Sequence, residues 1–308
     1  MTSGWQLALV AGAITALGGC NPKQDASSAH AGQLKARETR LKSRLAKATA
    51  ANTVKTPLAL WIMPAVLREI SGLALTPDGR LLTHGDEIAR IYEIDPRRGS
   101  VVKSFNVGKS VHGDFEGLTV AGSDLYLMMS KGVLLQFKEG ADGQRVPFTT
   151  HDLKLGKECE FEGVAFEKDS AWLVLPCKEV HVKDLKDDIV LYRWRLGTRA
   201  KDGITTLAVP LSEVIGSNKW KKFRPSDISI DPVTGNYVLI SSLEKGMAVI
   251  TPAGDVVWSG PLPGKHHQAE GVAIGKDGLL IISDEGSSKP ATIAVYRWVP
   301  PEPGQAPQ

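Results

Sequence analysis

The sequence of 308 residues predicts an all-β fold, a five-bladed β-propeller built from four-stranded antiparallel blades. The first observation is an internal repeat: five segments share the pattern strand, tight turn, strand. Aligned on the residue before a shared Gly or its equivalent, they are separated by 45, 46, 65 and 43 residues. The five segments are "REISGLALTPDGRLL", "GDFEGLTVAGSDLYL", "CEFEGVAFEKDSAWLVL", "PSDISIDPVTGNYVLI" and "QAEGVAIGKDGLLII".

The length of each repeat is the second observation. The first segment is followed by two more β-rich stretches, "RIYEIDP" and "SVVKSFNV", so one unit holds four strands in about 45 residues, which is the size of a propeller blade. The longer interval contains the polar insertions "HVKDLKDD", "LGTRAKDG" and "SNKWKK", which lengthen connections without requiring a sixth blade. A large sandwich of ordinary hairpins is the alternative architecture.

The two ends of the repeat region provide the third observation. The last unit stops after "TIAVYRW", its third strand, and would leave an exposed edge. The apolar run "TPLALWIMP", around residues 57–63, precedes the first unit and can form a strand. We therefore expect this run to complete the last blade and to join the two ends of the ring.

The sequence divides into four regions: a lipoprotein signal peptide (1–19), a flexible or helical tether (20–56), the propeller (57–299) and a disordered tail (300–308). An apolar stretch too short to span a bilayer ends in "LGGC", which resembles a bacterial lipobox and predicts lipidation of Cys20. The polar stretch after Cys20 predicts a flexible linker, and residues 33–55 predict a basic helix. An uncleaved anchor or a misassigned start codon is the alternative.

These features predict a protein that is lipid-anchored in the bacterial cell envelope and faces the periplasm. Asn21 after the lipidated cysteine is typical of proteins sorted to the outer membrane. The net charge of +3 is too small for this length to indicate nucleic-acid binding, and no basic patch with interleaved aromatic residues is present. We expect a monomer whose partners are the membrane and an anionic small molecule.

Carboxylates stand at the aligned position in four of the five repeats, and Ser71 takes that position in the first. Because the inner strands of all blades begin on one face of the ring, these acids should converge near the axis and repel one another unless a cation neutralises them. Several carboxylates without His or Cys suit Ca²⁺, and less well Mg²⁺ or Mn²⁺. The predicted metal ligands are Glu116, Glu162, Asp227 and Glu270, with a second tier of Glu69, Asp114 and Glu160. The alternative is that the acids merely solvate the mouth of an open channel.

Basic residues follow each second strand and should surround the same face. This basic rim would attract an anionic ligand such as a phosphate or a carboxylate ester, and it consists of Arg90, Lys131, Lys178, Lys245 and Lys289. The histidines that could act as acid or base there are His84, His112, His266 and His267. Exposed loop residues are the alternative reading of both sets, and no nucleophile motif is present.

The remaining two cysteines form a possible disulfide in an oxidising compartment. The hairpin turn of the third repeat at "EKDS" sets Cys159 directly opposite Cys177 on the neighbouring strand. A cross-strand pair at such a position is compatible with a disulfide bond. We therefore predict that this bond joins the first two strands of the third blade.

The motifs "REISGLALTPDGRLL", "DFEGL", "EFEGVAF" and "QAEGVAI", together with the lipoprotein-like leader, resemble the SdiA-regulated family of bacterial propellers over residues 66–298. The chain is also similar to esterase-like phytase propellers, which share an E-G-[IV]-A motif. The resemblance implies a calcium site in the central channel at Glu116, Glu162, Asp227 and Glu270. It favours the fold more than any reaction, because the family has no settled activity.

Two functions follow from these expectations. The first is an envelope-anchored, calcium-binding propeller that serves as a binding or scaffold module for an anionic ligand or partner. The second is a metal-dependent hydrolase, a phytase-like phosphoesterase or a lactonase, in which the metal polarises the substrate and a His or carboxylate activates water. The first is favoured, because no motif ties a histidine to the acids.

Overall fold

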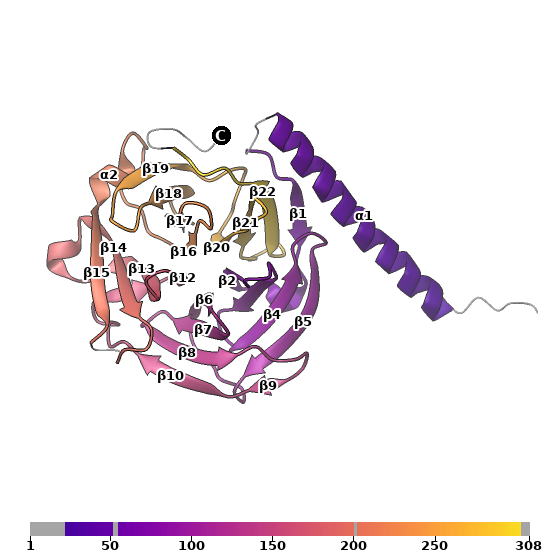
Figure 1. Cartoon of the computed structure of the whole chain (residues 1–308), viewed down its shortest axis with the longest axis horizontal. Coiled ribbons are helices and arrows are strands. Elements are labelled where there is room, and N and C mark those ends of the chain that lie inside the picture. Colours follow the sequence, from indigo (N-terminus) through magenta and orange to yellow (C-terminus); the bar gives the residue numbers. More distant parts are fainter. Residues whose placement is uncertain (1–21, 52–54, 200–201, 303–308) are drawn as a thin grey trace, which may run out of the picture.

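The structure is a computed structural model that describes residues 22–51, 55–199 and 202–302, with side chains from residue 30 onward. Within these residues the strands form five sheets arranged around a central axis (Figure 1). The five-bladed propeller is therefore confirmed. The predicted signal peptide, the lipidated Cys20, Asn21 and residues 303–308 of the predicted tail lie outside the described residues.

Within each blade the strands follow one another in chain order from the axis outward. The exceptions are the strands added at the outer edges of blades 1 and 5. Blade 1 contains β2 (Ile70–Leu75), β3 (Leu81–Gly85), β4 (Arg90–Asp95) and β5 (Ser100–Val107), with β9 (Arg145–Val146) paired to β5. Blade 2 contains β6 (Phe115–Ala121), β7 (Asp124–Met129), β8 (Val133–Lys138) and β10 (Phe148–Asp152). Blade 3 contains β11 (Cys159–Phe161) and β12 (Ala165–Glu167), both paired with β13 (Trp172–Val180), then β14 (Asp188–Arg195) and β15 (Ile204–Pro210).

The last two blades are four-stranded. Blade 4 contains β16 (Asp227–Ile230), β17 (Tyr237–Ser241), β18 (Gly246–Ile250) and β19 (Val256–Pro261). Blade 5 contains β20 (Ala269–Ile274), β21 (Leu279–Asp284), β22 (Thr292–Arg297) and β1 (Ala59–Ile62). The connections include η1 (Ala65–Leu67), η2 (Lys183–Leu185) and α2 (Leu211–Ile215). The insertions of the long interval lie in blade 3 and in the connection to blade 4.

Strand β1 closes the ring as the sequence predicts. It pairs antiparallel with β22, and Ala59 lies opposite Val295 in this pairing. Backbone hydrogen bonds from Leu58 N to Val295 O (2.7 Å) and from Met63 N to Ala291 O (2.9 Å) extend the contact at both ends. The strand that precedes blade 1 in the sequence therefore completes blade 5.

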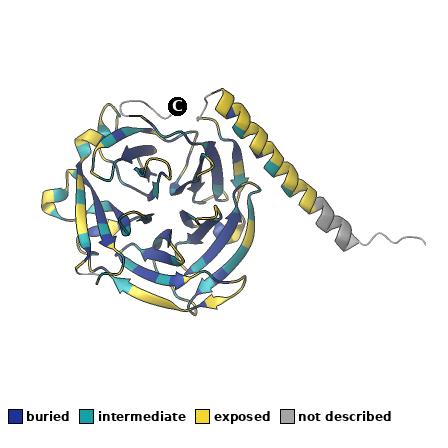
Figure 2. Cartoon of the chain, in the orientation of Figure 1, coloured by how far each residue is buried: buried dark blue, intermediate teal, exposed yellow. Residues whose placement is uncertain are grey.

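The hydrophobic core lies between the blades. Apolar side chains form five buried clusters, each of which joins two neighbouring blades. A middle strand such as β21 is buried along its whole length, because both faces of its sheet pack against another blade (Figure 2). Its continuous apolar pattern follows from this burial. The outer strand β10, in contrast, is exposed or half-buried throughout.

Glycines in the E-G motif let the inner strands approach one another. A Cβ atom on Gly117 would lie 2.7 Å from the carbonyl carbon of Gly163 and 2.7 Å from the backbone nitrogen of Val164 in the next blade. A Cβ atom on Gly163, which has a φ of +83°, would lie 2.7 Å from the Cα of Asp227. The short backbone distances therefore require a residue without a side chain at both positions.

Helix α1 (Pro22–Ala50) covers most of the segment predicted as a flexible or helical tether. It includes the stretch expected to be flexible, because Pro is favoured at a helix start and Ala, Gln and Lys are strong helix formers. Its second half packs on the propeller: Leu41 is 4% exposed, and Arg44 donates a 2.8 Å hydrogen bond to Leu58 O. None of the described helices is long and apolar enough to cross a membrane.

The disulfide between Cys159 and Cys177 is present, with 5.6 Å between the Cα atoms. The predicted register is wrong, however, because Cys159 lies opposite Val180 and Cys177 lies opposite Phe161. The turn lies at residues 168–171, after the last hairpin pair of Glu167 with Trp172, and this register continued outward sets Cys159 opposite Val180. The expectation of a turn at residues 167–170 therefore places it too early in the chain, and the bond crosses the ladder diagonally.

Candidate functional site

The inner strands surround a narrow central channel with a volume of about 130 Å³. Every blade contributes to its wall, with Leu73, Thr119, Val164, Ser229 and Ala273 as one representative from each. Most residues of this wall are apolar, but the surface that they present to the channel is mainly polar. The carboxylates predicted to converge stand where these strands begin, and therefore at one mouth of the channel.

β-Bulges set the direction of these side chains. The ladder skips one residue in three of the five inner strands: Ser71 in blade 1, Glu116 in blade 2 and Glu270 in blade 5. In blade 3 the equivalent residue, Glu162, lies in the gap between β11 and β12. Because a bulged residue leaves the alternation of the strand, its side chain can be directed toward the axis. We call Glu116, Glu162, Asp227 and Glu270 the central acids.

Glu116 is held by the residue that replaces an acid in the first repeat. The Ser71 hydroxyl donates a hydrogen bond of 3.0 Å to Glu116 Oε2. Burial, and then the negative charge of Glu162, raise the pKa of Glu116 to about 9. The Glu116 carboxyl is therefore protonated at neutral pH, and Ser71 takes the place of a further charge.

Lys178 on β13 supplies the positive charge at this mouth. Its Nζ atom lies 2.5 Å from Glu162 Oε1, and the side chain of Glu162 is only 5% exposed. Burial raises the pKa of Glu162 to about 7 although Lys178 lowers it. Burial alone would lower the pKa of Lys178, but the charges of Glu162, Glu270 and Glu116 outweigh it and raise this pKa.

The two remaining central acids have different surroundings. Asp227 is 2% exposed, and its Oδ2 accepts a hydrogen bond of 2.7 Å from the backbone nitrogen of Val272 in blade 5. Burial raises the pKa of Asp227 well above its usual range. Burial also raises the pKa of Glu270 to about 7, with Lys178 opposing the shift. Asp227 therefore joins two blades, whereas Glu270 belongs to the charge cluster around Lys178.

The donor set has the chemistry of a calcium site, since carboxylate oxygens predominate. The arrangement is different: among the described residues, no group of three or more His, Cys, Asp or Glu side chains is placed to hold a metal ion. Glu162 instead contacts an ammonium group, and Asp227 contacts the backbone. Among the described side chains, the central acids are therefore arranged around the Lys178 ammonium and do not form a ready metal site.

The second-tier residues influence the charge cluster, and Asp114 also forms a side-chain hydrogen bond with Glu116. Asp114 Oδ2 accepts a 2.5 Å hydrogen bond from the Ser130 hydroxyl, and its charge raises the pKa of Glu116. The charge of Glu160 raises the pKa of Glu162. The charge of Glu69 raises the pKa of Glu285, although burial and the charge of Asp86 contribute more to that shift. The whole mouth is therefore strongly acidic.

Of the basic rim, only Lys178 forms an ion pair with a central acid. Lys245 donates hydrogen bonds to the carbonyl oxygens of His266 (2.7 Å) and His267 (3.1 Å). Arg90 lies in a separate cavity on blade 1. Lys131 and Lys289 are exposed. The described structure thus does not gather these five residues into one anion site.

The four candidate histidines are also dispersed. His84 is fully buried, and burial lowers its pKa to about 4. His266 Nδ1 lies 2.7 Å from Asp284 Oδ2, and its Nε2 lies 3.0 Å from both Pro263 O and the Tyr296 hydroxyl. These contacts hold the His266 ring inside blade 5. His112 and His267 are exposed. None of the four rings contacts a central acid among the described residues.

Two acids at the mouth, Asp86 and Glu285, were missed in the sequence. Both follow a second strand, β3 or β21, at the position where only basic residues were sought. Burial raises the pKa of both, and a neighbouring carboxylate adds to each shift: Glu87 for Asp86, and Asp86 for Glu285. The signal that could have found them is an acid directly after the second strand, in "THGDE" and "SDEG".

No protein-family model matches the sequence, and no curated protein matches it. Solved structures of similar shape exist. Myxococcus xanthus glutaminyl cyclase shares 14% identity with a TM-score of 0.52, over 80% of this chain and 97% of that one. A luciferin-regenerating enzyme shares 10% identity with a TM-score of 0.50, over 82% and 100% of the two chains.

A third structure, the PQQ-bound aldose sugar dehydrogenase from Streptomyces coelicolor, shares 14% identity with a TM-score of 0.48, over 78% of this chain and 98% of that one. Identities this low concern the fold, and the names of these proteins give activities that differ from one another. Since fold does not imply function, the likeness concerns the fold alone. The chain has the β-propeller architecture that these structures share.

Proposed function

We propose that the protein is a binding or scaffold propeller whose acidic channel mouth takes up a cation. The observation that supports this most is the contact of 2.5 Å between Lys178 and Glu162 inside a ring of carboxyls. Burial and mutual repulsion raise the pKa of Glu116 to about 9 and that of Glu162 to about 7. One ammonium group and bound protons thus balance the acids, and an added cation would compete with both.

Calcium is the external cation that the proposal names, because the donors are carboxylate oxygens. A bound Ca²⁺ ion would compete with the Lys178 ammonium for the Glu162 carboxylate. Since the described side chains form no ready metal cage, the proposal predicts weak binding that strengthens when the ammonium is removed. Lys178 thereby determines whether the site is occupied.

The cellular location is a further part of the proposal. It rests on the sequence of residues 1–21, where the lipobox-like "LGGC" and Asn21 favour an anchor on the periplasmic side of the outer membrane. The similarity to the SdiA-regulated family rests in the same way on the E-G motifs. Radiolabelled fatty-acid incorporation in the full chain, compared with a Cys20→Ser variant, tests the anchor.

A thermal-shift comparison tests cation uptake. The wild-type protein and the Lys178→Met variant are melted in EDTA and in rising Ca²⁺ concentrations. The variant should melt at a lower temperature in EDTA, because Glu162 has lost its partner, and Ca²⁺ should raise its melting temperature more than that of the wild type. The Lys289→Met variant serves as the control, since Lys289 is exposed and makes no contact with the acids.

Two other outcomes would change the conclusion. If Ca²⁺ stabilises neither protein, uptake of a metal is wrong and Lys178 is a permanent internal counter-ion. Calcium-dependent turnover of generic phosphate esters or lactones would instead favour the phytase-like or lactonase-like hydrolase. The buried His84 and the fully bonded His266 are poor bases for that alternative, whereas His112 and His267 are exposed.

A further inference from the structure

A cavity of about 380 Å³ lies on blade 1, beside the acidic mouth. Its lining carries three arginines and three carboxylates: Arg68, Arg90, Arg145, Glu69, Asp86 and Glu87. None of these six side chains forms an ion pair with another in the described part of the chain. Opposite charges thus line one cavity while remaining apart, which leaves both signs available to a ligand.

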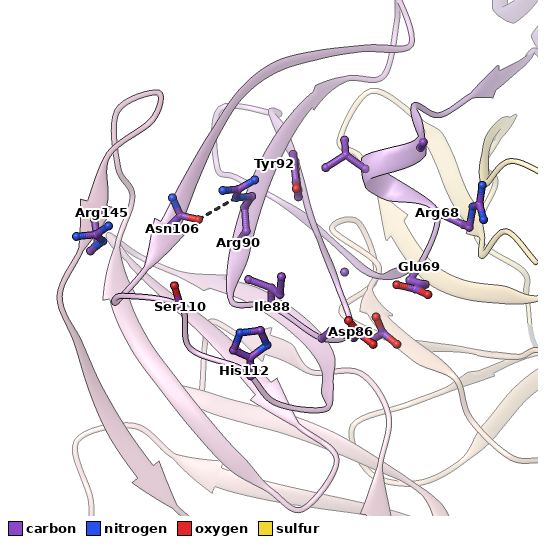
Figure 3. Close-up of a pocket in the computed structure, with 14 residues that line it drawn as sticks. Arg68, Glu69, Asp86, Ile88, Arg90, Tyr92, Asn106, Ser110, His112 and Arg145 are labelled. Atoms are coloured by element: carbon purple, nitrogen blue, oxygen red, sulfur yellow. Dashed lines mark hydrogen bonds between the residues drawn. The ribbon is translucent and has the colours of Figure 1, made fainter.

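The basic end of the cavity is a cross-strand row. Arg90 on β4 lies opposite Asn106 on β5, and Asn106 lies beside Arg145 on β9. Residues paired directly across strands project from the same face of a sheet, so the two arginines flank Asn106. Arg90 Nε donates a 2.8 Å hydrogen bond to Asn106 Oδ1, which orients the guanidinium (Figure 3). Its terminal nitrogens have no partner among the described residues and can bind a carboxylate in two-point geometry.

The acidic end of the cavity centres on Asp86, and Figure 3 shows Glu69 on the same side. Backbone hydrogen bonds from Phe115 N to Asp86 O (2.8 Å) and from Gly113 N to Glu87 O (3.1 Å) fix this loop to blade 2. Asp86 Oδ1 is buried and has no hydrogen-bond partner in the described structure. The carboxylate therefore keeps an unpaired negative charge, and because Asp86 is half-buried, an ammonium group of a ligand can pair with the oxygen that faces the cavity.

Apolar side chains separate the two ends. Ile88 is 43% exposed and Val66 is 57% exposed, although both are large hydrophobic residues, and both line the cavity. Figure 3 shows Ile88 between the basic row and Asp86. A short aliphatic body would cover this surface, while its charged ends reach the arginines and the carboxylates.

We propose that this cavity binds a small dipolar molecule, of the class of amino acids and short peptides. The carboxylate of the ligand lies between Arg90 and Arg145, and its ammonium group pairs with the half-buried Asp86 carboxylate. The balance of three positive and three negative side chains favours such a ligand over a simple anion, which the carboxylates would repel. The inference is independent of cation uptake at the channel mouth.

Isothermal titration calorimetry in EDTA tests the inference with alanyl-alanine, its N-acetyl form and its C-terminal amide. The dipolar peptide should bind the wild-type protein at least about tenfold more tightly than either blocked form. In Arg90→Met the amide should bind as well as the free peptide, because the carboxylate has lost its partner. In Asp86→Asn the same equality should hold for the N-acetyl form.

Matched controls separate binding from folding. Arg97→Met removes an arginine that pairs with Asp277 away from this cavity, and it should leave all three affinities unchanged. Arg145→Met alters an exposed residue and should weaken the free peptide without lowering the melting temperature. The inference is overturned if alanyl-alanine does not bind, if the three peptides bind alike, or if both arginine variants bind as the wild type does.

Discussion

The Lys178 ammonium lies 2.5 Å from the Glu162 carboxylate at the mouth of the central channel. This pair shows how one of the four carboxyls that converge near the axis is neutralised by the chain itself. The lysine neutralises one charge, and burial keeps protons on others by raising the pKa of Glu116 to about 9. Asp227 adds no strong repulsion, since burial favours its neutral form and the backbone binds it. The protein therefore has its own means of neutralising the charge, and an external cation would compete with it.

Stability should fall as the pH rises from about 7 to about 9. In the folded protein burial raises the pKa of Glu116 to about 9 and those of Glu162 and Glu270 to about 7, above the unfolded value of 4.5. The native state therefore binds more protons than the unfolded state, and the free energy of unfolding should decrease by about 2–3 kcal/mol over this range. Urea unfolding at several pH values measures the decrease.

Glu116→Gln provides the control, because it should remove most of this pH dependence. The window begins near pH 7 because His84, whose pKa burial lowers to about 4, has the opposite effect at lower pH. A free energy of unfolding that stays constant or rises between pH 7 and 9 would contradict the raised carboxyl pKa values.

Two glutamate substitutions should differ at neutral pH. Glu116→Gln replaces a protonated carboxyl by a neutral amide that can still accept from Ser71, so it should change the free energy of unfolding by less than about 1 kcal/mol. Glu162→Gln leaves Lys178 without its partner and should cost about 1–3 kcal/mol. Combining Glu162→Gln with Lys178→Met should recover part of this loss. If Glu116→Gln and Glu162→Gln lowered the free energy of unfolding equally, the ion pair between Lys178 and Glu162 would contribute nothing to stability.

The disulfide between Cys159 and Cys177 should be detectable by mass spectrometry under non-reducing conditions. The bond closes a loop with a sequence separation of 18, and its removal in the Cys159→Ser, Cys177→Ser double variant should cost about 2–4 kcal/mol. The variant should also loosen the start of blade 3, which hydrogen exchange can follow. Two free thiols in protein isolated from an oxidising compartment would contradict the bond.

Gly117→Ala should be strongly destabilising for so small a change. The added Cβ would lie 2.7 Å from backbone atoms of blade 3, so the inner strands must separate, at a cost of about 1–3 kcal/mol. Gly32→Ala in helix α1 has no atom within 4 Å of the new Cβ and should be neutral or stabilising. Thermal melts of the two variants provide the comparison. Similar melting temperatures would show that the inner strands can separate freely.

The sequence is sufficient to predict the ring and its closure, because both depend on local patterns. The repeat places Glu116 and its counterparts in register, and the apolar run that contains Ala59 lies where a missing strand is needed. In β1, which pairs with β22, Ala59 is buried and Trp61 packs against the same core, whereas Leu60 and Ile62 are exposed. The apolar run thus shows a strand, although not which of its side chains are buried.

Details of the site depend on contacts that periodicity does not encode. The hairpin turn at residues 168–171 makes Val180 the partner of Cys159, and nothing in the alternation of residues fixes the centre of that turn. Lys178 was grouped with four other basic residues, and only the fold distinguishes it from Lys245, which binds backbone carbonyls instead. Asp227 keeps the aligned position of an acid but uses its carboxylate to join two blades. Side chains at equivalent positions therefore differ in role because their neighbours differ.

Titration of the glutamate carboxyls by ¹³C NMR tests the central claim most directly. Selective labelling of glutamate, with Glu116→Gln and Glu162→Gln used for assignment, gives the pKa of each side chain in the folded protein. The account predicts one resonance that titrates at about 9 and disappears in Glu116→Gln, and another at about 7 that disappears in Glu162→Gln. Titration of both carboxyls near the ordinary value of 4.5 would contradict a channel mouth neutralised by protons and Lys178.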